Sequence, residues 1–462
     1  MIITISNALE VSKPTREVIE YCKDNLVILN PDYISKERMG KWIGNTPRDL
    51  YLYEKRGDVL YIPYGCKESI FSIAGNYQKT WDNYPDISNF KADYGSSIEL
   101  YEYQEKVVQA MLKAVHGVVV MPCGSGKTQT ALEAVARIGL KTLWLTHTQD
   151  LLHQSLERAK SCFRCNKDMY GTITAGKVDI SKGITFATVQ TMCKLDLSEY
   201  KKEWAVVIVD ECQHCCGSPT RMTQFYKVVN SLYAPYKFGL TATPDRNDGL
   251  EKSMYALLGK TISEISREQV SNTTCKVKIE TVETGYFPNY ETVLNGDGTI
   301  NYTNLVTDLI TNSDRFSSIM SVINDRCRSR AMVLASRVAY LEAMQQAYVG
   351  RSICLSSLGN SQKAKNERKD ALQKLNSGKI DCIFATYQLA AEGLDCRELR
   401  YIVFATPEKD KRIITQAVGR VARKAEGKEF GTVIDVVDAL GIYQGWAKKR
   451  RGYYTKLGCE FV

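Results

Sequence analysis

A chain of 462 residues is too long for one ordinary hydrophobic core, so we expect two large domains and a smaller one. The 61 lysines and arginines outnumber the 52 acidic residues and leave a net charge of +9, which suits a polyanionic partner but is shared by many basic enzymes. Fifteen cysteines without a secretory signature indicate reduced thiols and exclude a disulfide scaffold. The apolar runs reach only strand length, as at 205–209, so we expect a soluble, unanchored cytoplasmic protein.

The N-terminal segment predicts a small α/β module. Its pattern is strand, helix and then a hairpin, with hairpin strands expected at 50–55 and 59–63 around an Arg-Gly-Asp turn. Residues 75–97 are rich in Asn, Asp, Tyr, Gly and Ser and show no sustained periodicity, which predicts a linker. We assign residues 1–92 to an accessory module with its linker.

Beyond residue 98, short apolar runs alternate with helical or polar segments. This alternation is typical of a parallel, doubly wound sheet. It stops over a poorly patterned stretch at 272–303 and then resumes, which predicts a second α/β domain. The expected strands are 117–121, 142–145, 183–187 and 205–209 in the first domain, and 331–335, 381–385, 401–405 and 431–435 in the second. We place the domains at 93–268 and 269–462.

A glycine-containing turn lies between an expected buried strand and a helix. Such a turn lets backbone N–H groups surround a phosphate at the helix N-terminus, while Lys127 reaches the outer phosphates and Thr128 offers a hydroxyl to magnesium. The alternative is a turn that only caps the helix, but the preceding strand and following helix favour a nucleotide site. The predicted phosphate-binding residues are Pro122, Cys123, Gly124, Ser125, Gly126, Lys127 and Thr128.

Two acids follow the apolar run 206–209. Because they end a strand, both carboxylates are expected at the carboxyl edge of the sheet, where ligands of such folds bind. Asp210 is suited to hold magnesium through water, and Glu211 is suited to position and deprotonate an attacking water. Solvated acids are common at strand ends, so the pair indicates a nucleotide site mainly because a phosphate loop lies upstream.

Further motifs follow in a fixed order: a glutamine-containing motif at 101–104, two motifs at 146–150 and 187–191, the second motif at 210–214, the third at 239–244, the fifth at 385–395 and the sixth at 416–423. Together they resemble the motifs of the DEAD/DEAH-like helicases of superfamily 2, from about residue 100 to 423. The resemblance implies two RecA-like domains and a nucleic-acid-dependent ATPase that uses ATP and Mg²⁺. It also implies nucleotide contacts from Tyr101, Gln104, Gly393 and Asp395, catalytic roles for Gln416, Arg420 and Arg423, and coupling of hydrolysis to movement by Gln213, Thr241 and Thr243.

The same resemblance implies residues that touch the phosphate backbone of a nucleic acid. Contacts with the phosphate backbone do not distinguish one base from another. Binding should therefore be nearly independent of the nucleic-acid sequence and should weaken steeply with salt. These residues are Thr146, Thr188, Thr191, Ser336, Arg337 and Thr386.

The second and sixth motifs carry two further expectations. The second reads Asp-Glu-Cys-Gln-His, so Gln213 stands where the DEAH form has histidine; we expect it to bridge to the sixth motif and leave His214 unassigned. Arg420 and Arg423 are spaced three apart on an expected helix and should face the same way. From there they would neutralise charge on the transferring phosphate when a cleft closes.

Three segments are most similar in sequence to the XPB-like and UvsW-like DNA helicases. They are 240–246 at the third motif, 391–395 at the fifth motif and the closing basic segment 449–454. Phage-encoded members also carry a small N-terminal module, which 41–47 and the tyrosine-bearing hairpin resemble. That implies the cytoplasm of a bacterium or a phage-infected host. In the module, Arg48, Lys55 and Arg56 could contact DNA beside tyrosines, or the tyrosines could simply pack the hairpin.

The expected function is ATP-dependent unwinding or remodelling of duplex or branched DNA in repair, recombination or replication. The rivals are a duplex translocase that does not separate strands, an RNA helicase, and a non-catalytic, ATP-gated binding module. Cysteines and a histidine at 162–165 and 212–216 could suggest zinc, but they lack a known finger spacing and we expect free thiols.

Overall fold

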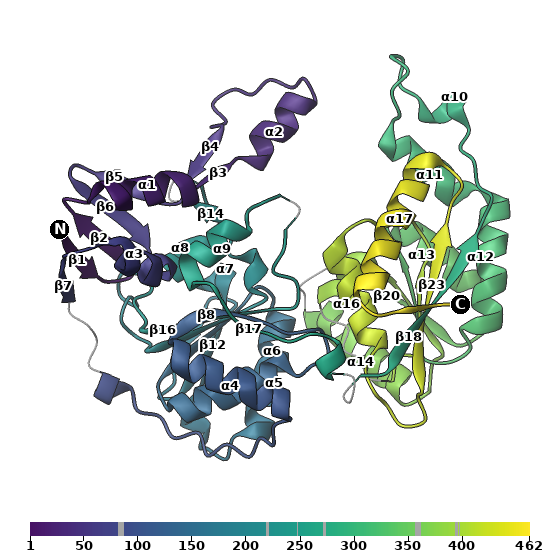
Figure 1. The fold of residues 1–462 in the computed structure, drawn as a ribbon. Helices are drawn as coiled ribbons and strands as arrows, with labels where there is room; N and C mark the ends of the chain where they lie inside the picture. The colour runs from purple at the N-terminus through teal and green to yellow at the C-terminus, as the bar shows by residue number, and fades with distance from the viewer. Residues whose placement is uncertain are drawn as a thin grey trace. The chain divides into compact units, whose positions relative to one another are not determined.

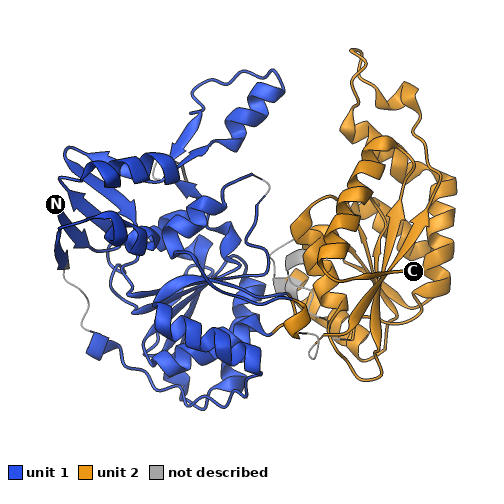
Figure 2. Cartoon of the chain, viewed as in Figure 1, with its two compact units in different colours: residues 1–122, 126–266 blue, residues 123–125, 267–462 orange. Residues whose placement is uncertain are grey.

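The chain folds into two compact units (Figure 2). The computed structural model describes residues 1–81, 87–218, 221–246, 248–270, 274–355, 362–392, 396 and 398–462. Unit 1 comprises residues 1–122 and 126–266, and unit 2 comprises residues 123–125 and 267–462. Over the ranges described, no helix combines the length and the apolar character needed to cross a membrane.

The N-terminal part of unit 1 is built on a five-stranded sheet of order β5-β6-β2-β1-β7 (Figure 1). Alternate residues of β1 and β2 are buried, because one face of the sheet packs on helices α1 and α3 and the other residues point away. The elements here are β1 Ile2–Ile5, β2 Ala8–Ser12, α1 Arg16–Asn25, β3 Val27–Leu29, α2 Pro31–Arg38, β4 Asp49–Tyr51, β5 Glu54–Arg56, β6 Val59–Pro63, α3 Lys67–Ile73 and β7 Gln78–Trp81.

The predicted hairpin is present, but its first strand is divided. Only β5 pairs with β6 around the turn, whereas β4 pairs with β3 in a separate two-stranded ribbon. The continuous strand expected at 50–55 is therefore wrong, since the chain bends at residues 52 and 53, between β4 and β5. Arg56 hydrogen-bonds Glu54 at 2.8 Å and lies over the ring of Tyr61.

The expected linker also contains regular structure. Residues 78–81 form β7, which pairs in parallel with β1 and so closes one edge of the N-terminal sheet. Because most side chains of this strand are polar, its sequence lacks the apolar alternation that predicts a strand. A strand at the edge of a sheet has one solvated side and tolerates that composition.

The main body of unit 1 is an eight-stranded sheet of order β11-β10-β12-β9-β13-β16-β8-β17, parallel except at the β10–β11 edge. Helices α4 to α6 cover one face and α7 to α9 the other (Figure 1). Its strands are β8 His116–Val120, β9 Thr142–Thr146, β10 Tyr170–Thr174, β11 Lys177–Asp179, β12 Ile184–Thr188, β13 Val206–Asp210, β16 Tyr236–Thr241 and β17 Thr261–Glu264. Its helices are α4 Glu102–Ala114, α5 Lys127–Ile138, α6 Gln149–Cys162, α7 Val189–Met192, α8 Gln224–Ser231 and α9 Glu251–Leu258.

The N-terminal module packs closely on this body. The Tyr233 hydroxyl donates to the Ile5 carbonyl at 2.9 Å, and the Asn7 side chain donates to the Asn230 carbonyl at 2.7 Å. A Cβ on Gly65 would lie 2.4 Å from the Gly259 nitrogen, so the backbones meet without room for a side chain. Lys237 is buried in this junction against the Tyr64 ring, and its burial lowers the pKa of the ammonium to about 7.

Unit 2 is a seven-stranded, all-parallel sheet of order β20-β21-β19-β22-β23-β18-β24. Its strands are β18 Lys276–Glu283, β19 Ala331–Ala335, β20 Ser352–Leu355, β21 Cys382–Thr386, β22 Tyr401–Phe404, β23 Phe430–Val437 and β24 Glu460–Phe461. Its helices are α10 Tyr290–Val293, α11 Tyr302–Thr311, α12 Ser313–Arg326, α13 Val338–Ala347, α14 Gln362–Asn376, α15 Tyr387–Glu392, α16 Lys411–Val421 and α17 Gly441–Lys456. The two doubly wound sheets confirm the predicted fold class.

Strand β18 lies in the stretch that lacks a sequence pattern. Only Val277 and Ile279 of this strand are buried, and the intervening residues reach solvent. The strand has no continuous apolar run by which its sequence would predict it, because a strand near the sheet edge keeps one polar face.

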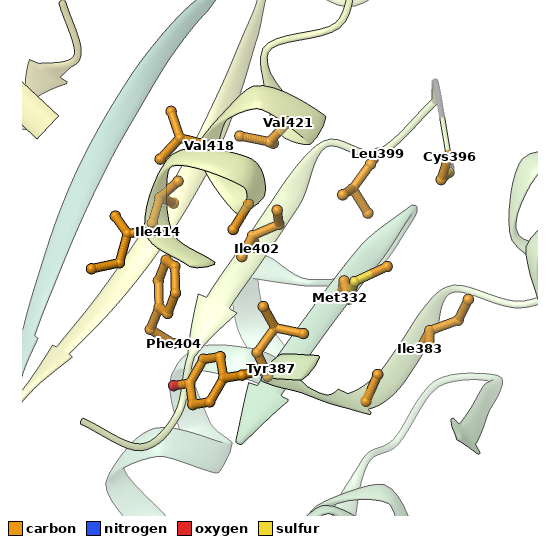
Figure 3. Packing of buried hydrophobic residues seen from close by; sticks show 14 of the residues in the cluster. Met332, Ile383, Tyr387, Cys396, Leu399, Ile402, Phe404, Ile414, Val418 and Val421 are labelled. Atoms are coloured by element: carbon orange, nitrogen blue, oxygen red, sulfur yellow. The ribbon is translucent and has the colours of Figure 1, made fainter. Parts of the chain in front are cut away.

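Helix α16 is held on the unit 2 sheet by a close-packed apolar layer (Figure 3). Ile414, Val418 and Val421 of the helix lie over Ile402 and Phe404 of β22, and all five are completely buried. Burying each such side chain stabilises the fold by about 1.5–3 kcal/mol.

Two buried ion pairs fix the end of β23. Arg315, fully buried on α12, forms a two-pronged contact with Asp438 at 2.7 and 3.0 Å and also donates to the Ala405 carbonyl. Arg450 of α17 contacts Asp435 at 2.8 Å. Because every charge has a partner, these pairs lock α12 and α17 to the sheet.

Replacing Arg315 with leucine should destabilise unit 2 by roughly 3–5 kcal/mol, because the Asp438 carboxylate would stay buried without its cation. Equilibrium urea unfolding followed by circular dichroism measures the change. The matched control is Arg326→Leu, whose pair with Asp325 is exposed at 57% and 75% and should matter by less than about 1 kcal/mol. Equal effects of the two substitutions would contradict the assigned role of the buried pair.

Candidate functional site

The phosphate loop connects β8 to α5, as its sequence predicts. Gly124 and Gly126 have φ values of 85° and 82°, in the left-handed region that favours glycine. Gly126 is the N-cap of α5, so the first backbone N–H groups of this helix follow the turn directly. A Cβ at Gly126 would lie 2.5 Å from the Gln104 side-chain nitrogen, so the position has no room for a larger residue.

Gln104 belongs to the first turn of α4 and is 3% exposed. Its side-chain oxygen accepts a hydrogen bond from the Tyr101 backbone nitrogen at 3.0 Å, which fixes the start of the helix. Tyr101 is 56% exposed, and its ring stacks on Tyr103. The sequence-predicted glutamine motif and the phosphate loop therefore meet at Gly126.

The two acids lie at the carboxyl end of β13. Asp210 ends the strand and is buried, and its carboxylate accepts from the Glu211 backbone nitrogen at 3.0 Å. Glu211 adopts φ 51° and ψ 52°, a left-handed conformation that costs a non-glycine residue roughly 1–3 kcal/mol. The Lys127 ammonium lies 3.4 Å from a Glu211 carboxylate oxygen, so the loop and the acids form one cluster.

The neighbouring carboxyl groups differ in their ionisation. Burial, reinforced by the adjacent Glu211 charge, raises the pKa of Asp210 to about 7. Burial also acts on Glu211, but the Lys127 ammonium and the Gln213 amide together outweigh it and lower its pKa. Glu211 is therefore an anion at neutral pH, as a base must be, and Asp210 is a buried carboxyl group that a cation would ionise.

A hydrogen-bond chain runs from Glu211 into the third motif. The Gln213 side-chain nitrogen donates to Glu211 at 2.7 Å, and the Thr241 hydroxyl donates to the Gln213 side-chain oxygen at 2.7 Å. The Thr243 backbone nitrogen donates to the Thr241 hydroxyl at 3.0 Å. Both ends of the Gln213 amide are thus engaged inside unit 1, and its bridge to the sixth motif stays a prediction.

Arg246 is a member of this network that the sequence analysis did not assign. It donates to the Gln213 carbonyl at 2.7 Å and is held by two hydrogen bonds to Asp248. The signal in the sequence was an arginine and an acid two residues apart, just after the third motif. Such a pair becomes informative only when the fold shows which backbone group the arginine reaches.

Of the threonines predicted to contact nucleic acid in unit 1, Thr146 and Thr188 end neighbouring strands, and Thr191 lies in α7, which follows β12. Thr146 of β9 and Thr188 of β12 are paired directly across the sheet. All of these side chains are buried: the Thr146 hydroxyl donates to the Thr148 carbonyl, and the Thr188 hydroxyl donates to Thr191. A side-chain contact with phosphate would require these hydroxyls to reorient, so the assignment stays a prediction.

The residues predicted to contact nucleic acid in unit 2 also lie at the carboxyl ends of neighbouring strands. Thr386 ends β21 beside Ala335, the last residue of β19, and Ser336 and Arg337 follow directly. Ser336 and Arg337 are exposed, whereas the Thr386 hydroxyl accepts a hydrogen bond from the Leu389 backbone. In each unit, the predicted contact residues thus gather at the carboxyl ends of adjacent strands, where ligands of such sheets bind.

The sixth motif is only partly helical. Gln416 and Arg420 lie on α16, but the helix ends at Val421 and Arg423 follows it. The expectation that both arginines share a helix face is therefore wrong. The Lys428 ammonium donates to the Val421 and Arg423 carbonyls, and Arg423 pairs with Thr274, so these contacts draw the chain out of the helix.

Two predicted nucleotide contacts, Gly393 and Asp395, lie outside the described residues. Around His214, the rings of His147 and Phe225 are 4.5 and 6.1 Å away, so the imidazole is part of an aromatic stack. Within the ranges that the structure covers, no group of three or more histidine, cysteine or acidic side chains could hold a metal ion, and no disulfide joins the cysteines.

Two protein families match consecutive parts of the chain. The family described as the res subunit of type III restriction enzymes matches residues 97–246, and the helicase conserved C-terminal domain matches residues 314–425. The first match covers the phosphate loop, the two acids and the third motif. The second covers the sixth motif.

Individual proteins are similar over most of the chain. A protein named DNA 3'-5' translocase XPB2 from Sulfurisphaera tokodaii is 27% identical over 78% of this chain and 78% of its own length. A protein of Acanthamoeba polyphaga mimivirus, whose name describes an ATP-dependent RNA helicase, is 27% identical over 76% of this chain and 66% of its own length.

Among solved structures, an ATP-dependent type ISP restriction-modification enzyme, LlaBIII, bound to DNA matches with a TM-score of 0.55. The match is 18% identical and covers 85% of this chain and 34% of that enzyme. At this identity, the likeness is one of fold.

Replacing Gly126 with alanine should destabilise unit 1 by more than the roughly 1–3 kcal/mol that left-handed backbone alone costs, because the new Cβ would have to displace the Gln104 amide. Thermal unfolding measures the change. Gly139→Ala is the matched control: it ends the same helix with φ 64°, and its nearest contact would be an ordinary 3.5 Å. If the two variants melt alike, the loop has more room than the structure indicates.

Proposed function

We propose that this chain, which belongs to superfamily 2 of the helicases and is close to the XPB-like group, is an ATP-driven motor that unwinds or remodels duplex or branched DNA. Both helicase regions occur in one chain, and the enzyme is an ATP-dependent nucleic-acid helicase. The observation that carries the finer proposal is the chain of contacts from Lys127 through Glu211 and Gln213 to Thr241.

The residues of the phosphate loop fit ATP. Gly124 and Gly126 leave the backbone free of side chains, α5 begins at the loop, and Lys127 supplies the cation for the outer phosphates. Asp210 and the Thr128 hydroxyl would hold Mg²⁺, which neutralises phosphate charge when bound. A buried carboxyl group whose pKa is raised fits this role, because a cation restores its ionised form.

Glu211 is the proposed general base. Its lowered pKa keeps it ionised at neutral pH, and its strained backbone directs the carboxylate to the end of the sheet beside Lys127. There it would orient a water molecule and accept its proton. Gln104 and Tyr101 would bind the base of the nucleotide, with Gln104 also supporting the loop at Gly126.

Gln213 and Thr241 are the proposed link between hydrolysis and movement. Any change in the position of Glu211 alters the hydrogen bond that Gln213 makes with it, and Thr241 passes that change to Thr243. Arg420 and Arg423 are proposed to stabilise charge on the transferring phosphate, with Gln416 beside them, when ATP draws the two domains together. Gly393 and Asp395 are proposed as further nucleotide contacts.

The nucleic acid is proposed to cross the carboxyl ends of the strands, where Thr146, Thr188 and Thr191 gather in one unit and Ser336, Arg337 and Thr386 in the other. The relative named as a DNA translocase supports DNA as the substrate, and the net charge of +9 suits a polyanion. The proposed domains are 1–92, 93–268 and 269–462.

The proposal predicts that DNA stimulates ATP hydrolysis and that Glu211→Gln lowers the stimulated turnover by roughly 10²- to 10⁴-fold while ATP still binds. Lys127→Ala should impair turnover as well, through loss of the phosphate contact. Steady-state ATPase assays and fluorescent-ATP titration measure both effects across single-stranded, blunt, forked and branched DNA. Lys160→Ala, an exposed lysine on α6, is the control and should behave as wild type.

The same assays separate the rival functions. ATP use without strand displacement on any DNA would replace unwinding by translocation, and stimulation by RNA alone would replace the substrate. Tight ATP binding with no hydrolysis on any nucleic acid would overturn the motor itself. Full turnover in the Glu211→Gln variant would remove Glu211 from the role of base.

Thr241→Val removes the hydroxyl that joins Gln213 to Thr243 while keeping the shape of the side chain. We expect ATP hydrolysis to change little and strand displacement per ATP to fall roughly 2- to 30-fold, the range of a coupling free energy of about 0.5–2 kcal/mol. Parallel ATPase and displacement assays give the ratio. Thr142→Val, equally buried at the opposite end of the same sheet, is the control; a similar ratio in both variants would exclude a coupling role.

A further inference from the structure

An arm extends from the N-terminal module of unit 1 (Figure 1). It consists of the β3–β4 ribbon, helix α2 and the loop 39–48 that returns to β4. No step of the proposed ATPase mechanism uses this arm. Its most exposed large residue is Trp42, at 88% of its full surface.

The loop has a defined conformation. Asn30, which is 1% exposed, joins the outgoing side of the arm to the returning side: its backbone nitrogen donates to the Arg48 carbonyl and its side chain donates to the Pro47 carbonyl, each at 2.8 Å. The Lys36 ammonium donates to the Thr46 hydroxyl at 2.6 Å. The position of the loop tip is therefore set by buried and part-buried hydrogen bonds.

The loop also orients the Trp42 ring. Gly44 has φ 53°, and a Cβ there would lie 2.7 Å from the indole, so the ring rests against the glycine backbone. One side of the indole is supported in this way, and most of the remainder is in water. Exposing a large aromatic surface is unfavourable unless a partner covers it.

The surroundings of Trp42 are polar and basic. Residues 36–48 contain four cations, Lys36, Arg38, Lys41 and Arg48, against one acid, Glu37, and the whole arm with its further acids Asp32 and Asp49 still has one more cation than acids. A pocket of about 330 Å³ adjoins the indole, and its polar lining includes Asn30, Asp32, Lys36, Asn45 and Thr46. Hydrogen-bonding groups beside an aromatic ring and a phosphate-binding charge are what a nucleotide requires.

Unit 2 offers a contrast. Phe287 is 65% exposed and Tyr290 is 51% exposed, but Glu283 and Glu291 flank them in the sequence. An aromatic surface with acidic neighbours disfavours a polyanion. The combination of aromatic and cationic side chains on a fixed loop belongs to the arm.

We propose that Trp42 stacks on an unpaired base of single-stranded DNA, while Lys41, Arg38 and Arg48 bind the neighbouring phosphates. The inference rests on the proposed DNA-dependent function and deepens it, because it assigns the accessory arm to the single strand that a fork or an opened duplex presents. Stacking has no base preference, which agrees with sequence-independent binding.

The test is binding of the full-length protein to oligo-dT and to a blunt duplex of equal length, measured by fluorescence anisotropy at two salt concentrations. Trp42→Ala should weaken binding to the single strand roughly 5- to 100-fold, the range for loss of one stacked base, and should leave the blunt duplex unchanged. Trp42→Phe should keep most of the affinity. Tryptophan emission of the wild type should be quenched by oligo-dT, and this quenching should be smaller in Trp42→Phe.

Phe287→Ala is the matched control, because it removes an exposed aromatic residue whose nearest charged residues in the sequence, Glu283 and Glu291, are acids, and it should bind like the wild type. Unchanged thermal unfolding of the Trp42 variants would show that the arm is folded. Wild-type affinity of Trp42→Ala for oligo-dT, or an equal loss on both DNAs, would overturn the inference. A wild-type protein with no DNA binding and no DNA-stimulated ATPase would instead overturn the proposed function.

Discussion

The contact on which the proposed mechanism depends is the ion pair between Lys127 and Glu211. It lies where two parallel strands end, and it joins a loop suited to phosphate with an acid suited to activate water. The lysine also holds the Glu211 carboxylate ionised in a buried position, because its charge offsets the cost of desolvation. Gln213 then connects this pair to Thr241, so the group proposed to perform chemistry and the segment proposed to transmit it share one amide side chain.

Parallel sheet topology explains why residues far apart in the sequence can act together. In both units the carboxyl ends of neighbouring strands meet at one edge, as Thr146 and Thr188 do in unit 1 and Ala335 and Thr386 do in unit 2. The edges depend on well-packed supports: α16 is buried against β22, and the Arg315–Asp438 pair anchors the end of β23.

The N-terminal module carries the second surface for which we propose a function. Its packing on the main sheet through Gly65, Tyr233 and the buried Lys237 ties it to the nucleotide-binding body. The arm that carries Trp42 extends from this firmly attached base, and its loop is fixed by Asn30. An aromatic residue on such a support can bind a base at a small cost in conformational entropy.

The sequence alone determined the fold class, the fully apolar strands and the nucleotide motifs, because each is recorded in a short local pattern such as Val206–Asp210 or the turn before Lys127. Half-polar edge strands such as β7 and β18 escaped it, since their stability comes from partners distant in the chain. Sequence spacing put Arg423 on a helix, and only tertiary contacts with Lys428 and Thr274 placed it beyond the helix end. The burial of Thr146 and Thr188, the engagement of Gln213 within unit 1 and the exposure of Trp42 were likewise decided by tertiary packing, because burial and partner choice depend on the whole fold.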